Sequence, residues 1–148
     1  MFQRKILARG VTNHLFNKNN VKQVFDSLKK SGVDGIELLV SSNATESDIQ
    51  KTKMILKQNS IPILSVHQSL TTLFDISITE VTNLANITRL LSAKILVLHL
   101  SALGDKIFDA KHVHALHALE KQYKISIGIE NNPKHPLSYL RRYTWKGE

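Results

Sequence analysis

The segment Ile95-Leu96-Val97-Leu98-His99-Leu100 is a nearly continuous aliphatic run with one histidine close to its end. A parallel strand that is covered on both faces requires this kind of run. Short apolar segments of strand length also occur at residues 6–11, 35–40, 63–67 and 125–130. We therefore expect five strands along the chain.

Amphipathic segments separate these expected strands. In the first, Val21, Val24, Phe25 and Leu28 follow the spacing of one buried helix face, and Gly32 is suited to end the helix. Further helices are expected from Thr45, which with Asp48 forms a capping-box pattern, along an apolar stripe from Val81 to Leu91, at residues 110–123, and from Leu137.

Regular alternation of strand and helix with short connections indicates a parallel sheet, because parallel neighbours need a crossover. The polar residues Glu37, His67, His99 and Glu130 follow one another at spacings of 30, 32 and 31 residues. A unit of that size is one βα module, and eight of them make the roughly 250 residues of a full barrel. The expected fold class is α/β: a partial (β/α)8 TIM barrel of about five parallel strands, in one domain over residues 1–148.

Composition narrows the classes of function. The formal net charge is +8, from 20 Lys+Arg against 12 Asp+Glu, which would attract phosphate-bearing partners. The basic residues are scattered over the expected helices, so solvated helix surface explains them better than a nucleic-acid groove. The absence of cysteine excludes disulfides and thiolate metal sites. No long apolar run or signal-like segment is evident, so we expect a cytoplasmic protein without a membrane span.

Four polar side chains lie at or near the carboxyl ends of four successive expected strands, which is where barrel enzymes place their active sites. They are Glu37, His67, His99 and Glu130. Two imidazoles and a carboxylate suit a divalent ion such as Zn²⁺, Mn²⁺ or Mg²⁺. Glu37 is a candidate for substrate contact or proton transfer, and a structural salt bridge would explain it equally well.

Other polar residues are weaker candidates. His14 follows the first strand and could line the mouth of the pocket, while Asn131 and His135 could bind substrate; loop or turn formation also explains them. His114 and His117 share one face of a helix, where exposed surface is a better explanation than a metal site.

Four short segments together resemble the xylose isomerase-like TIM-barrel superfamily, which contains sugar isomerases, epimerases and type IV apurinic endonucleases. They are Asp34-Gly35-Ile36-Glu37, Ser65-Val66-His67, Val97-Leu98-His99 and Gly128-Ile129-Glu130-Asn131-Asn132-Pro133. The resemblance implies that Glu130 is a metal ligand that also takes part in proton transfer. It implies that His67 and His99 are metal ligands in endonuclease-like members, and face the substrate or the metal in isomerase-like ones.

This resemblance also exposes a departure. The family's remaining ligands, an Asp, a His and a Glu, come from strands six to eight, and this sequence has no counterpart of those strands. We therefore expect a fragment, a truncated product or a half-barrel that needs a partner.

Three functions compete. The first is a metal-dependent isomerase or epimerase acting on a small sugar or sugar phosphate. The second is phosphodiester cleavage at abasic DNA, which the basic charge favours. Against it, the segment His67-Gln68-Ser69-Leu70-Thr71 lacks the proline and aromatic residue expected for DNA insertion. The third is an inactive truncated barrel, or one that forms a homo-oligomer to close its sheet.

Overall fold

A computed structural model describes residues 7–11, 21–69, 77–99 and 110–130 of the chain. Within these ranges five parallel strands form one sheet in the order β1-β2-β3-β4-β5, and four helices alternate with them. The strands are β1 (Leu7–Val11), β2 (Gly35–Val40), β3 (Ile63–Gln68), β4 (Ile95–His99) and β5 (Ser126–Glu130). The helices are α2 (Val21–Lys30), α3 (Glu46–Asn59), α4 (Ile78–Leu90) and α5 (Ala110–Tyr123). The predicted α/β fold class is confirmed, and the helix expected from Leu137 lies outside the described residues.

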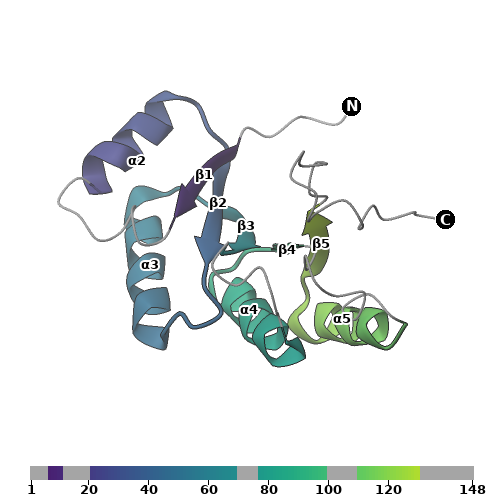
Figure 1. The fold of residues 1–148 in the computed structure, drawn as a ribbon. Coiled ribbons are helices and arrows are strands. Elements are labelled where there is room, and N and C mark those ends of the chain that lie inside the picture. Colours follow the sequence, from purple (N-terminus) through teal and green to yellow (C-terminus); the bar gives the residue numbers. More distant parts are fainter. Residues whose placement is uncertain (1–6, 12–20, 70–76, 100–109, 131–148) are drawn as a thin grey trace, which may run out of the picture.

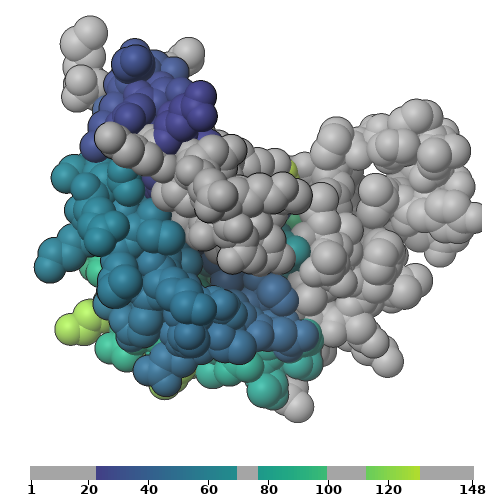
Figure 2. All heavy atoms as spheres, turned by 90° about the vertical axis from the view of Figure 1, so that its left-hand side faces the viewer, coloured from purple at the N-terminus to yellow at the C-terminus, as the bar shows by residue number. Residues whose placement is uncertain are grey.

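The helices lie along the outer side of the curved sheet, and α2 and α3 form the surface seen from that side (Figures 1 and 2). Alternate residues of β2, β3 and β4 face the helices and form one hydrophobic core with Phe25, Val81 and Leu84. The strand residues in this layer are almost completely buried: Ile36, Leu38, Val40, Val66, Leu96 and Leu98. Because side chains alternate along a strand, the intervening residues lie on the opposite, inner face of the sheet.

Local sequence signals place the ends of the helices. Thr45 caps α3, its side chain accepts a hydrogen bond from the Asp48 amide, and the reciprocal capping-box bond is present. Ser77 and Glu80 form a second capping box at the start of α4. Gly32, after α2, has a φ of 69°, as the sequence predicts for a residue that ends a helix. None of the helices in the described ranges is long and apolar enough to cross a membrane.

Close approach at the amino end of β2 requires a glycine. A Cβ atom on Gly35 would lie 2.7 Å from the carbonyl oxygen of Pro62 and 2.6 Å from a side-chain carbon of Leu64. The register between β2 and β3 then shifts after Ile36, so that Glu37 pairs with Ser65 and Leu39 with His67. This pairing sets the level at which each polar side chain stands on the inner face.

Candidate metal centre

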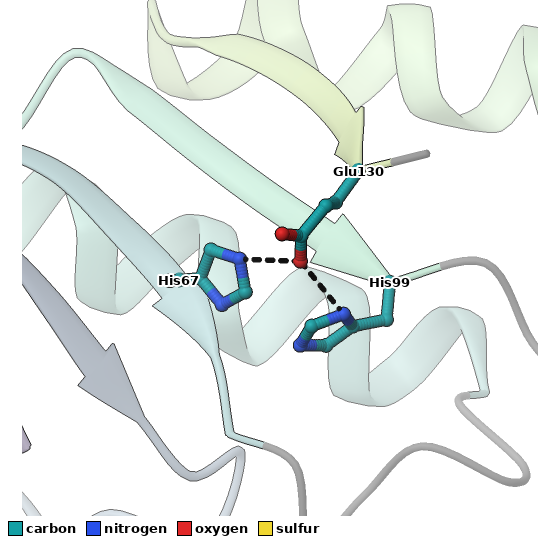
Figure 3. Close-up of side chains that lie close together, drawn as sticks. All are labelled: His67, His99 and Glu130. Carbon is teal, nitrogen blue, oxygen red and sulfur yellow. Dashed lines mark hydrogen bonds and ion pairs between the residues drawn. The ribbon is translucent and has the colours of Figure 1, made fainter. Parts of the chain in front are cut away.

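Three of the four predicted site residues meet at the carboxyl ends of neighbouring strands. His67 lies near the end of β3, His99 ends β4 and Glu130 ends β5. The parallel register pairs His67 with Val97, and His99 with Glu130. Paired residues of parallel strands, and residues two apart on one strand, share a face of the sheet. All three side chains therefore lie on the inner face, where Figure 3 shows them pointing toward one another.

One carboxylate oxygen lies between the two imidazoles. Oε2 of Glu130 is 3.1 Å from Nε2 of His67 and 3.1 Å from Nδ1 of His99. The two rings meet edge to face, with centroids 4.5 Å apart, and one donor atom from each residue lies within 4.8 Å of the other two. Donor atoms that share one ion at about 2.0–2.2 Å lie roughly 3–3.5 Å apart. The two distances to Oε2 fall in this range, and the three donor atoms, all within 4.8 Å of one another, could close around a single divalent ion.

A hydrogen bond at Nδ1 of His67 orients the other ring nitrogen, Nε2. Nδ1 of His67 is 3.0 Å from the backbone carbonyl oxygen of Gln68, which can only accept a hydrogen bond. Nδ1 therefore donates its hydrogen to that carbonyl, and Nε2 faces the Glu130 carboxylate. Nε2 and Oε2 lie 3.1 Å apart, a distance at which either a proton or a metal ion can lie between them. Metal-binding histidines are arranged in this way, with the second nitrogen donating to a carbonyl.

Burial differs across the cluster. His67 and His99 are buried, whereas the side chain of Glu130 is 35% exposed. The imidazoles are thus enclosed by the protein, and the Glu130 side chain is partly open to solvent. This arrangement can hold a cation and also bring a proton acceptor to a bound substrate.

Glu37 stands apart from this group. It is the third residue of β2, and its Oε2 accepts a 2.9 Å hydrogen bond from the Ser65 hydroxyl. Ser65 precedes His67 by two residues on the same face of β3, so Glu37 lies one level deeper in the sheet than the histidine. The three-residue cluster does not include Glu37. Its catalytic role stays a prediction.

The remaining predicted residues divide into two groups. His14, Asn131 and His135 lie outside the described residues, and their roles stay predictions. His114 and His117 are exposed on α5, and Nδ1 of His117 lies 2.9 Å from Oε2 of Glu120. Within the described ranges, the only metal-competent group of three histidine or acidic residues is the cluster at the strand ends.

Gln68 is a site residue that the sequence reasoning missed. It is 1% exposed at the end of β3, and its side-chain oxygen accepts a 3.0 Å hydrogen bond from the His99 amide. The available signal was a glutamine that directly follows a strand-end histidine, since a buried amide must find a partner.

A cavity of about 620 Å³ lies elsewhere, at the amino end of β3. Its lining includes Met54, Ile61, Ile63 and Leu91, with Lys53 and Lys57 from α3, and none of the three cluster residues. The candidate centre is therefore separate from this cavity.

No protein-family model matches the sequence, and no curated protein matches it significantly. Solved structures do. An E. coli 3-keto-D-glucoside 4-epimerase has a TM-score of 0.62 at 12% identity, over 90% of this chain and 58% of that chain. An uncharacterised protein of Parabacteroides distasonis has a TM-score of 0.60 at 11% identity, over 87% and 53% of the two chains. A D-tagatose 3-epimerase-like protein has a TM-score of 0.59 at 12% identity, over 90% and 55%.

These likenesses concern the fold. Most of this chain is covered in each comparison, but it spans between 53% and 58% of the length of the structures it matches. The strand order, the parallel pairing and the alternating helices agree with the architecture that the sequence predicts. The chain therefore shares the parallel α/β fold of these solved structures, over a little more than half of their length.

Proposed function

We propose that the protein is a metal-dependent isomerase or epimerase that moves a proton on a small sugar or sugar phosphate. The observation that carries this proposal is the cluster of two buried imidazoles around one oxygen of a partly exposed carboxylate. Fold similarity to a 3-keto-D-glucoside 4-epimerase and to a D-tagatose 3-epimerase-like protein supports the choice of substrate class.

His67, His99 and Glu130 would hold the ion, through Nε2, Nδ1 and Oε2 respectively. A bound divalent cation polarises adjacent carbonyl and hydroxyl oxygens and so makes the neighbouring C–H more acidic. The protein's own contribution begins with position: the hydrogen bond from His67 Nδ1 to the Gln68 carbonyl turns Nε2 toward the centre. No rotation of the ring is then needed when a ligand arrives.

Glu130 is the proposed proton carrier. A carboxylate has two oxygens, so Oε2 can face the imidazoles while Oε1 accepts the proton from a carbon next to a carbonyl. Partial exposure leaves this group within reach of substrate. Glu37, one level deeper than His67 and two levels deeper than Glu130 on the same face, is the candidate for a second proton-transferring carboxylate.

The chain supplies part of the site in this proposal. It spans 58% of the 3-keto-D-glucoside epimerase structure, so a complete catalytic cycle would need residues beyond those of this chain. Proton removal is a partial reaction that can be followed without complete turnover, so it is the appropriate step to measure.

The test combines metal binding with solvent exchange. Purified protein is titrated with Mn²⁺ and Zn²⁺ by calorimetry, then incubated with ketoses in D₂O, and deuterium incorporation next to the carbonyl is followed by NMR. We expect one tight site and slow deuterium uptake, both lost in Glu130→Gln. The matched control is Glu46→Gln, an exposed glutamate at the start of α3, which should behave as the wild type.

Two outcomes would contradict the proposal. Equal metal affinity in Glu130→Gln and Glu46→Gln would mean that the cluster does not hold the ion. Cleavage of an abasic-site duplex, with no exchange on any ketose, would replace the isomerase by a phosphodiesterase.

A further inference from the structure

Gln68 contacts both histidines of the cluster, through two different groups. It is the last residue of β3 and is 1% exposed, directly after His67 in the chain. Burying an amide side chain is unfavourable unless it is hydrogen bonded. The hydrogen bond that its side-chain oxygen accepts from the His99 amide offsets part of that cost.

The backbone group of Gln68 acts on His67. Its carbonyl oxygen lies 3.0 Å from Nδ1 and holds the hydrogen of the ring on that nitrogen. Nε2 is thereby directed at Glu130 Oε2, 3.1 Å away. This contact belongs to the main chain, so replacing the side chain of residue 68 leaves its acceptor in place.

The side chain of Gln68 acts on His99. The register between β3 and β4 ends at the pair His67 and Val97, two residues before His99. Beyond that pair Oε1 of Gln68 takes over as acceptor and receives the His99 amide hydrogen at 3.0 Å, in a fully buried contact. The side chain of Gln68 thus replaces a backbone acceptor of β3 and links β3 to β4 at the level of His99.

We infer that Gln68 is a positioning residue that sets the two imidazoles at metal-binding distance before any ion arrives. The inference rests on the proposed metal site. One residue determines which nitrogen of His67 faces the centre and how far the end of β4 stands from β3. The ring centroids, 4.5 Å apart, are the result. Residues that orient metal ligands in this way typically change metal affinity about 10–100-fold when they are replaced.

The experiment compares three variants of the full chain by Zn²⁺ calorimetry. Gln68→Met keeps the length of the side chain and removes the acceptor, and should weaken binding about 10–100-fold. Gln68→Glu keeps an oxygen acceptor and should retain most of the affinity. Gln58→Met makes the same substitution at an exposed position on α3 and should bind as the wild type does.

Two NMR measurements separate positioning from general disruption. The nitrogen shifts of His67 should report a hydrogen on Nδ1 in both Gln68 variants, because the acceptor there is the main chain. Exchange of the His99 amide should be slow in the wild type and in Gln68→Glu. In Gln68→Met it should be fast, or that variant should unfold.

The outcomes are distinguishable. Unchanged Zn²⁺ affinity in Gln68→Met, or fast exchange of the His99 amide in the wild type, overturns the inference and leaves the metal site standing. The exchange measurement on the wild type decides the point even if Gln68→Met fails to fold. Absence of Zn²⁺ binding in the wild type overturns the proposed function and, with it, the inference.

Discussion

Replacing Glu120 by alanine is expected to destabilise the protein through one hydrogen bond at the start of β5. The Ser126 amide donates to the Lys94 carbonyl, so the next amide, that of Ile127, points away from β4. Its acceptor is Oε1 of Glu120, at 2.7 Å. Within the described part of the chain no strand lies beyond β5, so the carboxylate occupies the place of a neighbouring strand at this residue. The same strand ends in Glu130.

The expected cost follows from the kind of bond. A hydrogen bond to a charged group contributes about 1.5–3 kcal/mol, and removing one partner leaves the other unsatisfied. The Glu120 side chain is 27% exposed, so water partly replaces it. We therefore expect Glu120→Ala to lower the free energy of unfolding by about 1–2 kcal/mol. Glu120→Gln retains an acceptor and should cost less than half of that.

The effect should depend on pH in a definite direction. The hydrogen bond from the Ile127 amide, assisted by His117, lowers the pKa of Glu120 below its ordinary value of 4.5. A carboxyl group with a lowered pKa in the folded state stabilises the fold above its ordinary pKa and loses that contribution as pH falls through the folded value. The difference between wild type and Glu120→Ala should thus be full at pH 7 and shrink below pH 4.5.

Urea unfolding at pH 7 and at steps down to about pH 3 measures this difference, provided that both proteins remain folded without denaturant. Lys121→Ala, at the exposed neighbouring position on α5, is the control and should change stability by less than about 0.5 kcal/mol. The reasoning is refuted if Glu120→Ala and Lys121→Ala are equally stable at pH 7. A difference that grows as the pH falls below 4.5 would also refute it.

Three further predictions concern the scaffold. Leu98→Ala removes a side chain that is 1% exposed and should cost about 2–5 kcal/mol in urea unfolding, whereas Met54→Ala, at 60% exposure, should cost less than about 0.5 kcal/mol. Ser77→Ala removes the N-cap of α4 and should lower the free energy of unfolding by about 0.5–2 kcal/mol. Thr79→Ala, at an exposed position of the same helix, is the control; equal thermal midpoints of the two variants would contradict the role of the cap. Gly35→Ala should cost about 1–3 kcal/mol, because its Cβ would lie 2.7 Å from the Pro62 carbonyl oxygen; unchanged urea unfolding would mean that the backbone relaxes there.

The elements of the described chain were predictable because their signals are local. The buried stripe of α4, Val81, Leu84, Ala85 and Thr88, is a helical repeat that can be read without knowing any partner. The capping box of Thr45 and Asp48 involves residues three apart, and the structure forms it. The aliphatic run from Ile95 becomes β4, which has a strand neighbour on each side, as its composition indicates.

The meeting of the three site residues followed from the module length, but their detailed placement did not. A spacing of 31 residues brings His99 and Glu130 into register on adjacent strands. Glu37 follows the same repeat and yet lies a level deeper, beside Ser65, because the strands are staggered and β2 continues to Val40. The stagger between two strands depends on how they pair, and the register shift after Ile36 cannot be recognised from the sequence spacing of the polar residues.

The sequence by itself determined the parallel α/β architecture and the rim on which two imidazoles and a carboxylate gather. Side-chain periodicity and the common direction of the strands suffice for both. Only the tertiary structure decided which nitrogen of each histidine faces Glu130, and that Gln68 connects the two histidines. Those features depend on hydrogen bonds whose directions are set by packing, one of them between residues 31 apart in the chain, and packing leaves no periodic trace in the order of the residues.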